Sequence, residues 1–462
     1  MAEKLGTTER PLRVAIVGSG PSGFYAAEAL FKSDFNVVVN MFERLTSPFG
    51  LVRYGVAPDH GKIKNVIKVY ERTAENENFN YFGNVSIGDD LSIHQLRKFH
   101  DAVIFAYGAA SDRKLGIVGE GLRGSHTATE FVAWYNGHPD FKDLDLDLSG
   151  ETAVIIGQGN VALDVARILC KTVDELKSTD IAQHALDVLA KSNIKNVHIV
   201  GRRGPAQTAF TPSEIREFGQ LDDCNPVIDP EELNLNEASK KELEDPANTQ
   251  KKKNVDILNE LVKINESGKS KKAYIQFHKS PSAIYDKDGN GRLDRIYLEK
   301  NELIGEAGSQ KSRGTDVKEI VECSLLFRSV GYRGLPLEGL AFDDRWGIVP
   351  NINGRICDSE HISTGLYATG WIKRGPSGVV GTNKACAAET VSNLLEDIDV
   401  LISGKNPSNK TLSALLDELN IRYITFDDWK VIDAEEIKRG EAVGKPREKI
   451  VDIKEVLRLL DS

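Results

Sequence analysis

The chain has 462 residues, of which 40% are hydrophobic and 28% charged, and its formal net charge is −10. This length divides into two or three domains, and the acidic balance excludes a protein that binds nucleic acid over its whole surface. No apolar run reaches the ~20 residues that a membrane span needs, and the five cysteines form no C-x-x-C pair, so we expect no metal site and a reducing compartment, either the cytoplasm or, for a processed chain, the mitochondrial matrix.

The first predicted unit is a strand, a glycine-rich turn and a helix near the N-terminus. The strand covers 14–17, the turn reads Gly18-Ser-Gly20-Pro-Ser-Gly23, and the helix covers 24–30. In such a unit Gly18 makes the tight turn, Gly20 lets the backbone approach a pyrophosphate, and Gly23 packs the helix on the strand. The pyrophosphate lies at the helix N-terminus, where free N–H groups and the helix dipole favour negative charge. The unit predicts a dinucleotide site.

An acidic residue then indicates which dinucleotide this first site takes. Glu43 ends the next predicted strand, 36–42, and lies 25 positions after Gly18. A carboxylate there accepts hydrogen bonds from both hydroxyls of an adenosine ribose and repels a 2′-phosphate. The first nucleotide is therefore expected to be FAD or NAD. The following loop, 47–60, holds two glycines and two prolines among apolar residues, which fits backbone held against a flavin or, equally, a rigid packed loop.

A second unit of the same kind starts about 140 residues later. Its strand covers 153–156, and its turn reads Gly157-Gln-Gly159-Asn-Val-Ala162. The partner strand, 196–200, is followed by Arg202 and Arg203 in place of an acid. Guanidinium groups bind a 2′-phosphate through charge-assisted bonds of roughly 1.5–3 kcal/mol each, so this site should prefer NADP(H). The spacing from Gly157 to Arg202, 45 positions, exceeds the usual ~20 and predicts a helical insertion within 171–192.

The C-terminal part is predicted to return to the flavin. A strand and turn at 365–370 lead through 371–378 to a helix from about 383. The N-terminus of such a helix would stabilise the negative charge of a reduced flavin. The predicted fold class is α/β, with two Rossmann-like dinucleotide-binding domains. The FAD domain is discontinuous, residues 1–110 and 335–462, and the NADP domain, 111–334, is inserted into it.

Several runs together resemble one family of flavoproteins. The runs 18–25, 48–60, 156–167, 201–205 and 370–376 are similar to those of adrenodoxin reductase and of ferredoxin–NADP reductases of the adrenodoxin-reductase type. The likeness extends along nearly the whole chain, including 429–444. The loop through His60 and the segment from Trp371 are far more specific than a dinucleotide turn.

The resemblance implies cofactor contacts residue by residue. FAD is expected to contact Gly20, Ser22, Glu43, Leu51, Ile87, Trp371, Gly378, Val379 and Val380. NADP(H) is expected to contact Gln158, Gly159, Asn160, Val161, Arg202, Arg203, Glu214 and Gly378. The family passes electrons to a small acidic iron–sulfur protein, a ferredoxin or adrenodoxin, through a basic surface. The candidates at matching places are Lys32, Arg216, Lys251, Lys252 and Lys253.

The expected reaction is electron transfer from NADPH to that iron–sulfur protein. A hydride moves to flavin N5, and the electrons leave one at a time. The resemblance also implies that His60 and Asp164 form a hydrogen-bonded pair beside the flavin, for proton movement or ring positioning, although two structural polar groups would explain them equally. The two turns would also suit a disulfide reductase, but such an enzyme needs a redox cysteine pair near the flavin, and the sequence has no C-x-x-C pair. The two turns would also suit an FAD/NADPH input subunit for a partner enzyme or a nucleotide-binding sensor.

Overall fold

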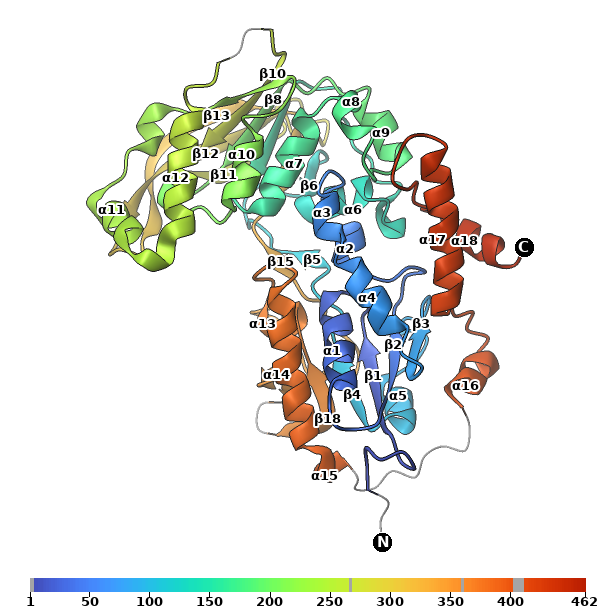
Figure 1. Ribbon diagram of the computed structural model, residues 1–462. Helices are drawn as coiled ribbons and strands as arrows, with labels where there is room; N and C mark the ends of the chain where they lie inside the picture. Colours follow the sequence, from blue (N-terminus) through green and yellow to red (C-terminus); the bar gives the residue numbers. More distant parts are fainter. Residues whose placement is uncertain (1–3, 266–267, 359–360, 402–410) are drawn as a thin grey trace.

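The computed structural model describes residues 4–265, 268–358, 361–401 and 411–462. The described chain forms two lobes, and each is built around its own sheet with helices against it (Figure 1). No helix among these residues is long and apolar enough to cross a membrane.

The lower lobe contains a seven-stranded sheet in the order β16-β17-β18-β4-β1-β2-β3. Its strands are β1 (Leu12–Val17), β2 (Val37–Phe42), β3 (Phe79–Phe82), β4 (Ala102–Phe105), β16 (Asn351–Ile352), β17 (Arg355–Cys357) and β18 (Ile362–Ala368). Val14 of β1 is in register with Val39 on one side and Ala102 on the other, both in parallel. All residues of β1 except Arg13 are apolar and buried, as expected of a central strand with both faces covered. Helices α1 (Pro21–Phe31) and α14 (Thr382–Glu396) pack together on one face (Figure 1).

The upper lobe contains a six-stranded parallel sheet in the order β6-β14-β7-β8-β10-β9. Its strands are β6 (Ser125–Thr127), β7 (Thr152–Ile156), β8 (Asn196–Val200), β9 (Cys224–Val227), β10 (Lys271–Gln276) and β14 (Leu325–Arg328). Its main helices are α6 (Ala128–Tyr135), α7 (Asn160–Cys170), α10 (Pro212–Glu217), α11 (Glu237–Glu244) and α12 (Thr249–Leu261). The predicted helical insertion is confirmed as α8 (Val173–Leu176) and α9 (Gln183–Leu189).

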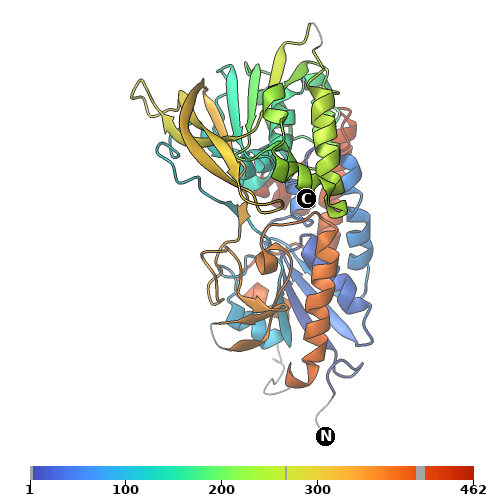
Figure 2. The same ribbon diagram turned by 90° about the vertical axis from the view of Figure 1, so that its left-hand side faces the viewer.

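A separate antiparallel sheet lies on the outer side of the upper lobe (Figure 2). It consists of β11 (Lys279–Tyr285), β12 (Arg295–Ile304) and β13 (Lys311–Glu322).

The chain passes between the lobes twice, and the two passages pair with each other. β5 (Ser111–Asp112) and β15 (Tyr332–Arg333) form a short antiparallel ribbon between the lobes. The lower sheet thus takes strands from before and after the upper one, which confirms the predicted fold class of two Rossmann-like units with one inserted into the other.

Helix α17 (Phe426–Glu441) packs against the loop 47–60, and the segment after this helix contacts the upper lobe. The helix places Trp429 edge-on against Phe49, with ring centroids 5.7 Å apart. Arg53 Nη2 donates to Glu436 Oε1 at 2.6 Å, and both side chains are buried. Beyond α17, Lys445 Nζ donates to the carbonyl of Ile181 in the upper lobe at 3.1 Å. A buried ion pair and an edge-on aromatic contact therefore fix a loop that the sequence leaves undecided between packing and cofactor binding.

The remaining helices are short. They are α2 (Leu51–Tyr54), α3 (Gly61–Lys64), α4 (Ile67–Ala74), α5 (Ile93–Phe99), α13 (Trp371–Arg374), α15 (Ile398–Leu401), α16 (Leu412–Glu418) and α18 (Ile453–Leu460).

Candidate functional site

The glycines of the first turn divide into two that the fold needs and one that it does not. Gly18 has φ +103°, and a Cβ there would lie 2.7 Å from the carbonyl oxygen of Ala106. A Cβ at Gly23 would collide with the carbonyl of Gly18. Gly20, at the N-cap of α1, has ordinary φ, and a Cβ added there would have no described atom within 4 Å. The chain therefore leaves open space at a helix N-terminus, which is the arrangement that a bound pyrophosphate requires.

Glu43 turns back onto this first turn. Its Oε2 accepts hydrogen bonds from Ser19 N at 3.2 Å and Ser19 Oγ at 2.7 Å, and its Oε1 accepts from Leu45 N at 3.1 Å. A carboxylate has about four acceptor positions, so it can still accept from hydroxyls of a ligand. Ile87, predicted at the same site, is a buried member of the core cluster under this sheet.

The loop 47–60 lies against the first turn. Phe49 N donates to the carbonyl of Ser19 at 3.0 Å, and a Cβ at Gly50 would lie 3.0 Å from Gly20 Cα. Leu51 then opens α2 with its side chain half-buried. The loop and the first glycine turn are thus direct neighbours in the fold.

The C-terminal segment reaches the same place. Ser22 Oγ, on α1, donates to Asn383 Oδ1, on α14, at 3.0 Å. Trp371 opens α13, and its indole Nε1 donates to the carbonyl of Ser377 at 3.2 Å. Residues 378–380 precede α14, and the Val379 side chain is 62% exposed. The loop 47–60 and the C-terminal segment, far apart in sequence, therefore both meet the first turn.

The second turn repeats the pattern in the upper lobe. Gly157 has φ +136°, and a Cβ there would collide with the carbonyl of Ser329, whereas Gly159, at the N-cap of α7, has no described atom within 4 Å of its Cβ position. The neighbouring side chains form hydrogen bonds within the chain. Gln158 Nε2 donates to the carbonyl of Gln276 at 2.8 Å, and Asn160 Oδ1 accepts from Thr211 N at 2.8 Å. Among the described residues, the space next to the backbone of Gly159 is open, as it is at Gly20.

Arg202 and Arg203 follow β8, and both are exposed. Arg203 Nη2 makes a long hydrogen bond of 3.4 Å to the carbonyl of Gln207 and lines a pocket of about 310 Å³. Val161, the second residue of α7, is half-buried. The two guanidinium groups are thus available for an anion at the strand end where the first unit has Glu43.

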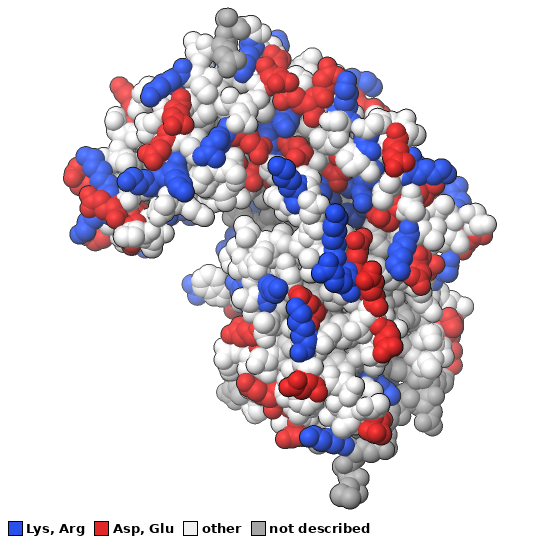
Figure 3. Space-filling view, viewed as in Figure 1, with Lys and Arg blue, Asp and Glu red and all other residues white. Residues whose placement is uncertain are grey.

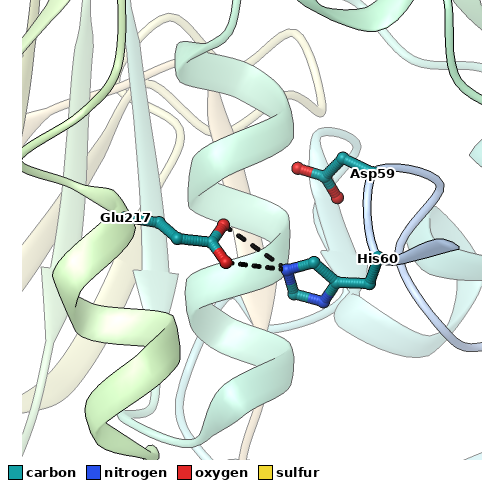
Figure 4. A group of neighbouring side chains, drawn as sticks. All are labelled: Asp59, His60 and Glu217. Carbon is teal, nitrogen blue, oxygen red and sulfur yellow. Dashed lines mark hydrogen bonds and ion pairs between the residues drawn. The ribbon is translucent and has the colours of Figure 1, made fainter. Parts of the chain in front are cut away.

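A cluster of charged side chains joins the two lobes, and Figure 4 shows part of it. His60 comes from the loop of the lower lobe, and its Nε2 lies 3.1 Å from Glu217 Oε1 on α10. The nearest approach of His60 to Asp164, Nδ1 to Oδ1, is 3.9 Å. The expected hydrogen bond between His60 and Asp164 is therefore not formed, because Asp164 Oδ1 accepts from Arg167 Nη2 at 2.7 Å instead.

Three groups of this interlobe cluster, Glu214, Asp164 and His60, have raised pKa values. Burial raises the pKa of Glu214 to about 7. Burial also raises the pKa of Asp164, although Arg167 opposes the shift. The pKa of His60 is raised, because its hydrogen bond to Glu217 and the nearby carboxylates outweigh burial and Arg167. The cluster can hold a proton at the boundary of the lobes and exchange it with small changes in its surroundings.

The centre of the interlobe cluster is a residue that the sequence does not single out. Arg167 is fully buried and pairs with Asp59, Asp164 and Glu214 at 2.8, 2.7 and 3.3 Å. Arg167 follows Asp164 by three residues, and Glu217 follows Glu214 by three. Side chains at that spacing share a helix face, so the spacing could have pointed to Arg167 beside Asp164 and to Glu217 beside Glu214.

All five cysteines are free thiols, and only Cys357 is not buried. The fold brings Cys170 next to Cys224, whose hydrogen bond, together with burial, raises the pKa of the Cys170 thiol. Cys170 is the last residue of α7, eleven positions after Gly159, or about 16 Å along the helix. A buried thiol with a raised pKa this far from the turn does not have the properties of a redox-active cysteine.

Comparisons with known proteins agree with this geometry. Residues 12–219 match the family model of pyridine nucleotide-disulphide oxidoreductases. The chain is 44% identical to NADPH-ferredoxin reductase FprA of Mycobacterium tuberculosis over 97% of this chain and 99% of that protein. It is 41% identical to the mitochondrial NADPH:adrenodoxin oxidoreductase of Salvelinus fontinalis, over 97% and 91%. The structure of FprA in complex with NADPH superimposes with a TM-score of 0.90 over 98% of this chain and 100% of that one.

Identity of this extent, over nine tenths or more of both chains, is shared by the mitochondrial and the bacterial relatives. The chain therefore belongs to the family of NADPH:adrenodoxin oxidoreductases and NADPH-ferredoxin reductases.

Proposed function

We propose that the chain is an FAD-dependent oxidoreductase that passes electrons from NADPH to a ferredoxin-type iron–sulfur protein. The observation that carries this proposal is the pair of glycine turns, each with one open glycine at a helix N-terminus. An acid follows the first turn, and two arginines follow the second, so the two sites favour different nucleotides. The names of the relatives, adrenodoxin oxidoreductase and ferredoxin reductase, support electron transfer from NADPH to an iron–sulfur protein.

The first turn and the segments that meet it are proposed to hold FAD. The residues are Gly18, Gly20, Ser22, Gly23, Glu43, Leu51, Ile87, Trp371, Gly378, Val379 and Val380. When bound, FAD supplies the conversion between a two-electron hydride donor and one-electron acceptors. The chain's part is to bind the pyrophosphate at the N-terminus of α1, to hold the ribose on Glu43, and to position the ring with the loop that α17 braces.

The second turn is proposed to hold NADPH. The residues are Gln158, Gly159, Asn160, Val161, Arg202, Arg203 and Glu214, together with Gly378 of the lower lobe. The domain bounds proposed for the two nucleotides, 1–110 with 335–462 for FAD and 111–334 for NADPH, are supported by the membership of the two sheets and by the β5–β15 ribbon between them.

His60 and Asp164 are proposed to act on protons at the boundary of the two sites. His60 lies on the loop assigned to FAD, and Asp164 lies on the helix assigned to NADPH. The raised pKa of each group supports a role in which the interlobe cluster holds a proton that a change of flavin charge would attract or release. Glu217, as the hydrogen-bond partner of His60, would position the imidazole.

The partner is proposed to dock on exposed cations of the upper lobe. Arg216, Lys252 and Lys253 are exposed and have no ion-pair partner within the part of the chain described. Lys32, also predicted for docking, is paired with Glu28, and Lys251 with Glu242, so these two are less available. Figure 3 shows that Lys and Arg side chains on this face are interspersed with Asp and Glu. Attraction of an acidic partner would therefore be local.

Ionic strength should change the rate of electron transfer to the docked partner but not the rate of flavin reduction by NADPH. A chain of net charge −10 repels an acidic partner unless a local patch lies within a Debye length of ~8 Å. We expect kcat/KM for an acidic ferredoxin to fall about tenfold or more between low and high ionic strength, while reduction of a neutral quinone stays nearly constant. Steady-state rates over a salt series measure both, and a ferredoxin rate that does not respond to salt would rule out this surface.

A reducing compartment is also proposed, the cytoplasm or the mitochondrial matrix. The five free thiols and the mitochondrial location named for the eukaryotic relatives support it. Recovery of the protein in a secreted fraction after cell fractionation would argue against it.

A further inference from the structure

The pocket of about 310 Å³ beside Arg203 contains polar residues that the proposed function does not use. Lys251, Glu242 and Gln310 line it together with Arg203 and Ala209. Ala209 N donates to the carbonyl of Gln158 at 3.0 Å, so the pocket lies between the second glycine turn and the arginine that follows β8. It is therefore next to the path that a nucleotide would take from Gly159 to Arg203.

Lys251 is directed into this pocket by the packing of α12. Asn254, three residues further along the helix and hence on the same face, donates through Nδ2 to the carbonyl of Phe210 at 2.8 Å and to Thr208 Oγ1 at 3.3 Å. That face of α12 thus packs on the segment that follows Arg203. Lys252 is exposed on another face. The three consecutive lysines do not form one surface.

The buried carboxylate of Glu242 holds Lys251 in place. The side chain of Glu242, on α11, is 2% exposed and accepts from Lys251 Nζ, from Gln207 Nε2 at 3.0 Å and from Gly308 N at 3.3 Å. Its negative charge is shared by three donors from three different elements. An ammonium group has three donors, and Glu242 is the one partner of Lys251 within the described residues, so two donors are left for a ligand.

A second observation points to a ligand at the same place. Gln310 Nε2 is buried and has no hydrogen-bond partner in the described chain, and Gln310 lines the same pocket as Arg203 and Lys251. A buried donor without a partner costs free energy unless something fills the site. Two cations and a spare amide donor around one pocket are suited to a phosphate group.

We infer that Lys251 is a third cation of the site for the 2′-phosphate of NADPH, held in position by Glu242, and not a docking residue for the iron–sulfur protein. This inference rests on the proposed function, because it adds a specificity-determining residue to the same nucleotide site.

The test compares Lys251→Met with Lys241→Met, a matched control. Lys241 is exposed and directly precedes Glu242. Steady-state reduction of a neutral quinone is measured with NADPH and with NADH. Lys251→Met is expected to raise the KM for NADPH about tenfold, the lower range for loss of one charge-assisted bond, with kcat and the KM for NADH unchanged. Lys251→Arg should retain most of the NADPH affinity, and Lys241→Met should change neither constant.

Several different outcomes would overturn the inference. Equal rises of KM for both nucleotides in Lys251→Met and Lys251→Gln, accompanied by a lower Tm, would mean that Lys251 only supports the fold. A higher KM for ferredoxin with an unchanged KM for NADPH would return Lys251 to the docking surface. If replacement of Arg202 and Arg203 removes the NADPH preference and Lys251→Met does not lower it, this inference fails alone. If neither replacement lowers it, the proposed nucleotide site fails as well.

Discussion

Replacing Arg202 and Arg203 together by alanine is expected to abolish the preference for NADPH over NADH. Each guanidinium can make a charge-assisted bond to the 2′-phosphate worth about 1.5–3 kcal/mol, so losing both should lower kcat/KM for NADPH by about 100-fold or more. NADH has no 2′-phosphate, and its kcat/KM should change little. Both side chains are exposed, and their removal should leave the fold intact.

The matched control is Arg313→Ala. Arg313 is also exposed in the upper lobe, on β13, where it pairs with Glu302. It should leave the ratio of the two kcat/KM values unchanged, which separates the phosphate contact from a general loss of positive charge. A double variant of Arg202 and Arg203 that still prefers NADPH would show that the 2′-phosphate binds elsewhere.

Gly159→Val is expected to produce a folded, yellow protein that NADPH no longer reduces. No described atom lies within 4 Å of the Cβ position at Gly159, and its φ is −105°. The chain itself therefore tolerates a side chain, at a helix-cap cost of about 1–2 kcal/mol or less. A nucleotide pyrophosphate would meet that side chain. Activity with NADPH should fall by a factor on the order of 1,000, while the FAD content stays at one per chain, as measured by absorbance after purification.

The companion variant Gly20→Val should have the opposite phenotype. Gly20 is equally open, so the protein should fold but purify without flavin. Gly121→Val, at an open glycine outside both turns, should behave as the parent does. If Gly159→Val lost flavin, or Gly20→Val retained it, the assignment of the two turns to two different nucleotides would be wrong.

The sequence alone predicts those parts of the site whose interactions lie within a few residues of one another. The strand 196–200 is predicted to the residue, because its apolar residues Val197, Ile199 and Val200 are followed at once by a glycine and two arginines that end it. The division of each turn into a tight glycine and an open glycine follows from spacing. Both depend on interactions within a few residues, which a single sequence records.

The partners of the charged residues depend on packing between distant segments. His60 bonds to Glu217, 157 positions away, and not to Asp164, because Arg167 already engages Asp164. Lys251 forms one basic run with Lys252 and Lys253 in the sequence, yet successive residues on a helix point about 100° apart. Only the face that carries Asn254 packs inward. Neither result follows from composition or charge.

The brace from α17 is not predictable from the sequence either. The pairing of Arg53 with Glu436 spans 383 positions, and the sequence shows two ordinary charged residues. Both side chains are buried, so this contact matters for stability: loss of one partner leaves an uncompensated charge in the interior.

A single electron path, through two bound nucleotides to one protein acceptor, is the core of the proposed function. Its most direct test is an anaerobic titration of the purified protein followed by optical absorbance. One equivalent of NADPH should bleach the flavin absorbance, an equal amount of NADH should do so far more slowly, and oxidised [2Fe–2S] ferredoxin should restore it. A protein that purifies without flavin under conditions that retain its fold, or a flavin that NADPH reduces but no ferredoxin-type protein reoxidises, would contradict this electron path.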